Sequence, residues 1–412
     1  MLLVVAAINI FIDPFSIFGT PRIQGWSEIK PSAWGRPGFH KTFAVQDLKP
    51  DALILGTSRA EVGLNPKHPA FAGLRAYNLA ISGGNMEQIG GYFAHARAVT
   101  KPRLVVLGLD LHSFNVRFPG RSDFDPNMFT EDPYWEPLLE PLKKLGVAIN
   151  GQTLEQSLST IDDQYRPADH RWMPEGQGWV NPIAMDARVR EYGGQRNMCL
   201  IDEALVTRTE YVPPPTYEFN FGLHLKNSPL EHFRRILREA YAREMALHIF
   251  ISPVHARHLE VLHSLGLLQT YEDWERLLVK TVAEEAKRAG KEPFPLWDFS
   301  GYNSVTTETV PAKNDSQSRM RGYWESSHYR GETGDLVLNR IFGLKTESKN
   351  EATDFGVLLN PVNIESHLAD FRAGRQRYAK QHAGDVAEVA VEISKIYKNK
   401  NHLKNSQLPH KE

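Results

Sequence analysis

Short apolar runs alternate with helix-like stretches between residues 51 and 299, and a polar or glycine-rich turn follows each run. Continuous apolar runs of this kind are typical of parallel strands that are buried on both faces. The clearest strand candidates are residues 52–56, 76–81, 104–109, 247–251 and 294–297. Helix-like stretches cover residues 86–99, 228–245 and 271–289. This alternation predicts an α/β fold with a doubly wound parallel sheet of five strands.

Residues from about 117 to 225 break this alternation. They are rich in Pro, Asp, Trp and Tyr and show no convincing periodicity. Stretches of this length usually form a lid, a binding surface or a subdomain, so we expect a long insertion over the sheet edge. A loosely ordered linker is the alternative. We therefore divide the chain into a linker at 13–50, an α/β domain at 51–344 and a polar helical tail at 345–412, which is partly disordered.

The first twelve residues, 1–12, form an uncharged apolar run that ends at Asp13-Pro14. The run is shorter than the roughly 18 to 20 residues that a membrane-spanning helix needs. It also lacks the basic region and the cleavage site of a secretory signal. Two interpretations stay open, a buried or interfacial apolar segment and the trailing half of a truncated membrane anchor.

The overall composition narrows the class of protein. Hydrophobic residues make up 41% and charged residues 24% of the 412 residues, which excludes a wholly disordered or collagen-like chain. The 48 basic and 49 acidic residues give a net charge of −1, so we expect no nucleic acid among the partners. A single cysteine, Cys199, excludes an intrachain disulfide framework and a multi-cysteine metal site. No nucleotide-binding motif follows a strand, and we expect no cofactor.

The ends of the predicted strands are the places to look for chemistry, because open parallel sheets bind ligands at their carboxyl ends. Ser58 follows the first strand, where it could act as a nucleophile or cap the next helix. Gly83 and Gly84 follow the second strand. Their backbone N–H groups could stabilise an oxyanion, or the pair could simply form a tight turn.

Carboxylates and histidines also gather near these strand ends. Glu325 and His328 are three residues apart before an expected last helix, which lets the carboxylate hold one ring nitrogen while the other accepts a proton from serine. A surface ion pair is the alternative. His255 and His258 follow the fourth strand, but they lack a third ligand of clear spacing, so we expect no metal site and interpret His255 as a pocket-lining donor. Asp298 ends the fifth strand and could orient the histidine instead of Glu325.

Four short blocks at these strand ends, in this order, resemble the SGNH hydrolase superfamily, whose members share a five-stranded flavodoxin-like α/β domain. The family's Gly-Asp-Ser block corresponds to residues 56–58, which read Gly-Thr-Ser, and its Asn-x-x-Ile-Ser-Gly block to residues 78–83. Its Gly-x-Asn-Asp block corresponds to Gly-Leu-Asp at 108–110, and its Asp-x-x-His block to Glu-Ser-Ser-His at 325–328. The resemblance covers roughly residues 50–120 and 240–343.

The resemblance implies a role for each matching residue. Ser58 would be the nucleophile, His328 the general base and Glu325 the residue that orients the histidine. The N–H groups of Gly83 and Ser58 would stabilise the oxyanion.

The third block departs from the family, because Asp110 stands where an asparagine is expected. A carboxylate cannot donate to an oxyanion unless it is protonated, so we expect Asp110 to position a substrate hydroxyl. Asn85 or Asn115 would then supply the missing donor.

The variant Gly-Thr-Ser block and the apolar N-terminus resemble a membrane-anchored bacterial branch of this superfamily. That branch includes relatives of alginate O-acetylation proteins and of the lipoteichoic-acid D-alanylation protein. The resemblance implies a serine-dependent acyl ester hydrolase or O-acyltransferase that moves an acetyl-like group on a cell-envelope or extracellular polysaccharide. It also implies an extracytoplasmic location, periplasmic or at the cell surface, an N-terminal anchor in the inner membrane, and a multispanning membrane acyltransferase as partner.

Two rival interpretations remain. The Gly-Thr-Ser-Arg-Ala run at 56–60 approximates the nucleophile elbow of α/β-hydrolases, but that elbow follows several strands rather than the first. The other rival is a catalytically silent scaffold or binding protein of an envelope-modification complex. Asp110 and Glu325 favour the silent protein, whereas the intact Ser58 and His328 oppose it.

Overall fold

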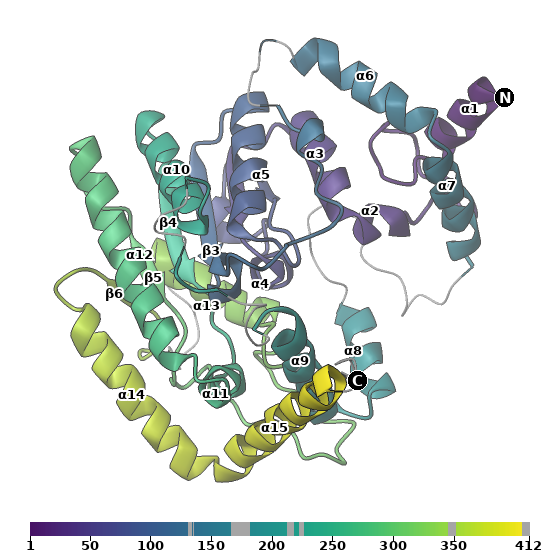
Figure 1. The fold of residues 1–412 in the computed structure, drawn as a ribbon. Coiled ribbons are helices and arrows are strands. Elements are labelled where there is room, and N and C mark those ends of the chain that lie inside the picture. The colour runs from purple at the N-terminus through teal and green to yellow at the C-terminus, as the bar shows by residue number, and fades with distance from the viewer. Residues whose placement is uncertain are drawn as a thin grey trace, which may run out of the picture.

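The computed structural model describes residues 1–130, 134, 136–165, 182–211, 218–221, 226–344 and 352–405 (Figure 1). Within them the chain forms one sheet of six strands in the order β2-β1-β3-β4-β5-β6. The strands are β1 (Ala52–Leu55), β2 (Ala76–Asn78), β3 (Leu104–Leu109), β4 (Ala246–Ile251), β5 (Leu296–Asp298) and β6 (Val357–Leu359). The first five are parallel, and β6 pairs antiparallel with β5. The predicted α/β class and the five predicted parallel strands are confirmed, and the sheet has a sixth, antiparallel strand that the sequence did not predict.

Helices cover both faces of this sheet, which explains the continuous apolar character of its central strands. Leu53 and Leu55 of β1 enter one core, and Ala52 and Ile54 enter the other. The first core is lined by helices α5 (Met86–Val99), α10 (Pro229–Ala242) and α12 (Leu268–Ala289). The second is lined by α4 (Ser58–Gly63) and α13 (Gly331–Phe342).

The segment at 117–225 contains regular structure that its sequence did not reveal. Its described residues include the helices α6 (Glu136–Ala148), α7 (Gly151–Asp163), α8 (Pro182–Glu191) and α9 (Gln195–Thr209). Figure 1 shows them in two separate groups. Helices α6 and α7 pack against α1 (Leu2–Ile12), whereas α9 packs against α11 (Ala256–Ser264) and α15 (Ala383–Asn405). The described residues of the expected long insertion thus form two helical units.

The N-terminal residues pack onto the first of these units. The buried side chain of Asn9 donates to the Ala148 carbonyl oxygen at 2.8 Å and accepts from Ser157 Oγ at 2.9 Å. The predicted linker at 13–50 contains α2 (Pro31–Gly35) and α3 (Pro37–Leu48), and α3 contacts α5. Helix α1 has 11 residues, and no helix in the described ranges is long and apolar enough to cross a membrane.

The C-terminal residues belong to the same domain as the sheet. Beyond β6, the chain forms α14 (Ile364–Gln381) and α15, and their apolar side chains join the first core. Arg257 of α11 is fully buried and forms ion pairs with Asp385 at 3.2 Å and Glu388 at 2.8 Å. The expectation of a solvated helical tail is corrected for residues 352–405, since they supply a strand, core side chains and the carboxylates that pair with the buried Arg257.

Candidate functional site

Ser58 lies in the turn between β1 and α4. Gly56 has a φ of 145°, and a Cβ atom there would come within 3.0 Å of the Gly108 carbonyl oxygen, so this turn requires glycine. The N-cap of α4 is Thr57, whose Oγ1 accepts from the Arg59 backbone N–H at 3.3 Å. The capping role that we considered for Ser58 therefore belongs to Thr57, and Ser58 is the first helical residue.

The Ser58 hydroxyl lies against a histidine that a carboxylate holds. Ser58 Oγ is 2.7 Å from His328 Nε2, although the two residues are 270 positions apart in the chain. His328 Nδ1 contacts Glu325 Oε1. The Glu325 side chain is only 4% exposed, whereas that of His328 is 25% exposed. The structure thus brings together the three residues that the sequence pattern singled out, with the carboxylate inside and the imidazole reaching the surface.

Glu325 and His328 lie in a closed turn before α13, rather than in a helix. Tyr323 and Tyr329 form an antiparallel bridge, and the Trp324 N–H donates to the His328 carbonyl oxygen at 2.9 Å. This closed turn places His328, three residues after Glu325, against the Glu325 carboxylate. The Glu-x-x-His spacing therefore brings the two side chains together in a turn as well as in a helix. Glu325 Oε1 also accepts from the His328 N–H at 3.1 Å.

A second carboxyl group, which sequence reasoning missed, lies beside Glu325. Asp202 comes from α9, and its Oδ2 accepts from Ser327 Oγ at 2.6 Å and from Ser326 Oγ at 3.2 Å. One ligand atom each of Asp202, Glu325 and His328 lie within 4.8 Å of one another. The second helical unit of the 117–225 segment therefore reaches the candidate site.

The two carboxyl groups have opposite protonation preferences. Burial and the neighbouring Glu325 charge raise the pKa of Asp202 well above its usual range, which favours the neutral acid. Burial alone would also raise the pKa of Glu325, but His328, Asp202 and the Ser327 N–H lower that pKa to about 2. The pair is thus a carboxylic acid beside a carboxylate, and the negative charge resides on the group that faces the histidine.

The candidate oxyanion loop runs next to the nucleophile turn. The Ile81 N–H donates to the Gly56 carbonyl oxygen at 3.0 Å, and Gly83 has a φ of 65°. The tight-turn interpretation of Gly83 therefore holds, and its role as an N–H donor stays a prediction. Glu61 of α4 is ion-paired with the buried Lys41 at 2.8 Å and accepts from the Ser82 N–H at 2.8 Å, which ties this loop to the nucleophile helix.

The two asparagines considered as substitute donors have other partners. Asn85 is the N-cap of α5, and its side-chain amide donates to the Phe118 carbonyl oxygen at 3.2 Å. Asn115 donates to the Glu210 carbonyl oxygen at 3.0 Å. Both amides are thus used for local structure in this conformation.

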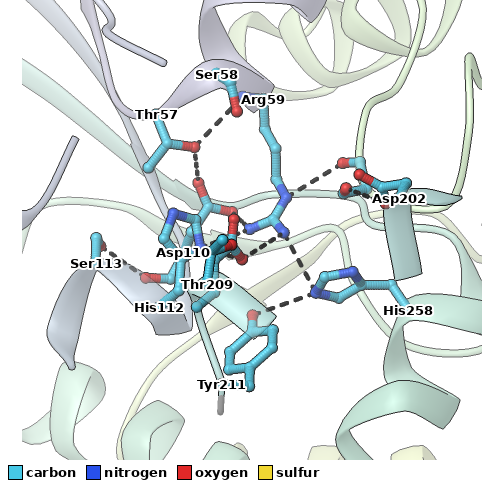
Figure 2. A network of polar contacts seen from close by, with 12 residues as sticks. Thr57, Ser58, Arg59, Asp110, His112, Ser113, Asp202, Thr209, Tyr211 and His258 are labelled. Atoms are coloured by element: carbon cyan, nitrogen blue, oxygen red, sulfur yellow. Dashed lines mark hydrogen bonds and ion pairs between the residues drawn. The ribbon is translucent and has the colours of Figure 1, made fainter. Parts of the chain in front are cut away.

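Asp110 belongs to a buried polar network under the turn that carries Ser58 (Figure 2). Its carboxylate accepts from Thr57 Oγ1 at 2.5 Å and pairs with Arg59 at 2.9 Å. Burial alone would raise the pKa of Asp110, but Arg59, His112 and Thr57 hold that pKa below its usual range. These contacts turn Asp110 toward protein groups and give no geometric support to the predicted contact with a substrate hydroxyl.

Arg59 connects this network to the loop that carries Glu325 and His328. Its Nε donates to the Ser327 carbonyl oxygen at 3.2 Å, and its Nη2 lies 3.2 Å from His258 Nε2. The Tyr211 hydroxyl lies 3.2 Å from the same ring nitrogen of His258. The residue after Ser58 thus holds the loop that carries His328 through the Ser327 carbonyl oxygen. Figure 2 shows Arg59 and Tyr211 both directed at His258.

His255 and Asp298 take other roles. His255 is the N-cap of α11, with Nδ1 accepting from the Arg257 N–H and Nε2 lying 2.7 Å from the Glu308 carbonyl oxygen. Burial lowers the pKa of His255 to about 4, and its position gives no geometric support to a pocket-lining role. Asp298 does pair with a histidine, but with His367 at 2.7 Å. The orienting position beside His328 therefore belongs to Glu325.

Comparison with known proteins adds no family assignment. No protein-family model matches the chain, and no curated protein is similar enough to count as a relative.

Proposed function

We propose that the protein is a serine-dependent acyl ester hydrolase or O-acyltransferase that works through an acyl-Ser58 intermediate. The observation that carries this proposal is the contact of Ser58 Oγ with His328 Nε2 at 2.7 Å, with Glu325 on the other ring nitrogen. In this arrangement the carboxylate fixes the tautomer in which Nδ1 carries the proton and Nε2 is free to accept one.

The chemistry follows from this geometry. As the Ser58 oxygen attacks the acyl carbon, its proton moves to His328 Nε2, and the carbonyl oxygen becomes an oxyanion. The N–H groups of Ser58 and Gly83 are the proposed oxyanion donors. When the tetrahedral intermediate collapses, the leaving alcohol takes the proton from His328 and the acyl group remains on Ser58. Water or an acceptor hydroxyl then attacks the ester while His328 again accepts and returns a proton.

The finer fold and the substrate belong to the same proposal. The strand order β2-β1-β3-β4-β5 is that of flavodoxin-like doubly wound sheets, which supports an SGNH-hydrolase-like domain. We infer a cell-envelope or extracellular polysaccharide as substrate, an extracytoplasmic location with an N-terminal anchor, and a multispanning acyltransferase as partner, all from the resemblance of the sequence blocks.

A catalytically silent scaffold or binding protein is the second candidate, and one observation favours it. Asp110 is paired with Arg59, and the amides of Asn85 and Asn115, the two substitute donors considered, both donate to backbone carbonyl oxygens. If the backbone donors of Ser58 and Gly83 are insufficient, the site would hold an ester without cleaving it.

Hydrolysis of an activated acetyl ester separates the two candidates. The wild-type protein should release the alcohol with saturation kinetics, and Ser58→Ala should reduce the rate to that of the ester in buffer. Ser366→Ala, at an exposed serine on α14, is the matched control and should keep the wild-type rate. Equal rates for the wild type and Ser58→Ala would overturn the proposal and favour the silent protein. Adding sugar acceptors then distinguishes transfer from hydrolysis.

A further inference from the structure

A second cluster of two carboxylates and a histidine lies at the end of β5, in residues that the proposed reaction does not use. Glu275 comes from α12, Asp298 is the last residue of β5, and His367 comes from α14. His367 Nε2 is 2.7 Å from Asp298 Oδ2 and 3.6 Å from Glu275 Oε2. One ligand atom from each residue lies within 4.8 Å of the other two.

Glu275 gives this cluster its unusual character. Its side chain is 0% exposed, and its two oxygens make no hydrogen bond of regular geometry among the described residues, although the Tyr271 hydroxyl lies near them. The hydroxyl of the neighbouring Tyr271 donates to Ser300 Oγ at 2.8 Å. Burying an ionised carboxylate costs free energy unless the charge is paired or coordinated. The two oxygens of Glu275 are therefore placed as if for a ligand.

The surrounding charges favour a cation as that ligand. Glu275 and Asp298 carry two negative charges when ionised, and both side chains are 0% exposed. Among the described residues, His367 is the one basic group within ion-pair distance of either carboxylate. One divalent cation would neutralise both charges and leave the imidazole neutral, as a metal ligand requires.

We infer that Glu275, Asp298 and His367 bind one divalent cation of the Zn²⁺ or Mn²⁺ class. Imidazole nitrogen together with two carboxylates suits these ions, whereas Ca²⁺ and Mg²⁺ prefer oxygen ligands alone. Ligand distances of about 2.0–2.2 Å around a tetrahedral Zn²⁺ place the ligand atoms about 3.4 Å apart. The distances of 2.7 and 3.6 Å from His367 Nε2 to the two carboxylates lie on either side of that value. This inference differs from our expectation from sequence, which included no metal.

The cation would have a structural role. It would connect α14 to α12 and to the end of β5, next to the antiparallel strand β6. Helix α15, which follows α14, packs against α9 and α11. Metal binding would therefore stabilise the attachment of residues 364–405 to the sheet, independently of the chemistry at Ser58.

A metal-free alternative makes a different prediction for one substitution. Without a cation, the cluster is neutral if Glu275 keeps its proton and a charged His367 faces Asp298. Glutamine has the shape of a protonated glutamate, so in this case Glu275→Gln would leave thermal stability unchanged. Neither the wild type nor the variant would then respond to added metal. If the residue is a metal ligand, the same substitution removes the response to Zn²⁺.

The test uses the full chain after dialysis against a chelator. Isothermal titration with Zn²⁺, and separately with Mn²⁺, should show one site per chain, and saturating ion should raise Tm by at least about 4 °C. Ca²⁺ and Mg²⁺ at the same concentration should give no shift. Glu275→Gln should lose the site and the shift. His328→Ala, which removes a ligand from the other cluster, should retain both.

Two outcomes overturn the inference: no binding by the dialysed wild-type protein, or a Tm shift that survives in Glu275→Gln. Should Glu275→Gln fail to fold, His367→Gln at the partly exposed ligand replaces it, with the same loss expected. Ester hydrolysis is measured on the same preparations. Metal binding without hydrolysis contradicts only the proposed function, and hydrolysis without metal binding contradicts only this inference.

Discussion

Two clusters near the carboxyl ends of the parallel strands contain the same three groups, two carboxyl groups and one histidine, in different surroundings. At His328, Glu325 holds Nδ1 and Nε2 faces Ser58 Oγ at 2.7 Å. At His367, Nε2 itself faces the two carboxylates. The first histidine has a nitrogen available for proton transfer to a nucleophile, whereas the second presents its nitrogen to two acids.

The second carboxyl group also differs between the clusters. Asp202 accepts from the hydroxyls of Ser326 and Ser327, and burial together with the Glu325 charge raises its pKa and favours its neutral form. Glu275 makes no hydrogen bond of regular geometry among the described residues. The comparison teaches that residue types alone do not determine chemistry. Two features separate a candidate catalytic triad from a candidate metal site. One is the atom that faces the imidazole nitrogen, and the other is the set of hydrogen-bond partners of the second carboxyl group, Asp202 or Glu275.

The largest effect is expected from the histidine that faces serine. His328→Ala should lower kcat/KM for an activated acetyl ester by about 10³-fold or more, because nucleophile and base act as a unit. Combining it with Ser58→Ala should add little further loss. Additive losses in the double variant, measured by steady-state kinetics, would show that the two residues do not work together.

The next effect concerns the charge that orients this histidine. Glu325→Gln keeps the size of the side chain but removes the carboxylate, and we expect kcat to fall about 10²- to 10⁴-fold. In the wild type, the pKa of Glu325 is about 2, which lies below the ordinary value of a glutamate. Glu325 therefore contributes stability that is present above about pH 4.3 and is lost as the pH falls toward 2. Thermal unfolding against pH should show this acid loss in the wild type, reduced in Glu325→Gln. An unchanged kcat would place the orienting role elsewhere.

The buried network of Arg59 and Asp110 should matter for stability. Arg59→Leu leaves the Asp110 carboxylate buried without its ion-pair partner, and we expect the free energy of unfolding to fall by about 3–5 kcal/mol. The double variant Arg59→Leu/Asp110→Leu should lose less, since the fully buried Asp110 charge is removed together with its partner. Arg117→Leu breaks the exposed pair with Glu218 and should cost no more than about 1 kcal/mol. Urea unfolding measures all three, and equal losses for the buried and exposed pairs would contradict this account.

The smallest effect is expected at Asp202. Asp202→Ala should lower kcat/KM about 10-fold, or about 1.4 kcal/mol, because Glu325 loses a neighbouring acid. Asp202→Asn supplies an N–H donor of the same shape and should stay within about 3-fold of the wild type. A pH profile checks the positioning role, since the Asn variant cannot gain a second charge beside Glu325 and its activity should fall less than that of the wild type as the pH rises.

The same residue gives a stability test with a defined sign. The raised pKa of Asp202 means that the folded state binds its proton more tightly, so the acid reduces stability increasingly as the pH rises above its ordinary pKa of about 3.9. Asp202→Asn should therefore raise Tm at pH 7 and have little effect near pH 3. A Tm that falls equally at both pH values would contradict the assigned protonation.

Part of the fold and of the site was predictable from local pattern. The central strands β1 and β3 are buried on both faces, and their apolar runs identified them. Ser58 and His328 were found because strand ends and a Glu-x-x-His spacing can be read directly. Strand β6 escaped prediction because Val357 and Leu358 are exposed and the strand has three residues. Such a short edge strand has no periodic signal.

Other features depended on long-range packing but left signals in the sequence. In α9, Met198, Cys199, Asp202 and Val206 follow helical spacing and are buried, so an acid lay on the inner face of an amphipathic helix. In α15, the spacing of Val389, Ile393 and Ile396 is that of a buried helix face. The pairing of His367 with Asp298 could not be predicted, because it joins residues 69 positions apart without a local motif.

The measurement that tests the account most directly is the intact mass of the protein after incubation with a fluorophosphonate, followed by peptide mapping. We predict one adduct, located on Ser58, that is absent in Ser58→Ala, strongly slowed in His328→Ala and unaffected by Ser366→Ala. No adduct on the folded wild-type protein, or an adduct formed equally fast in His328→Ala, would contradict the claim that His328 activates Ser58.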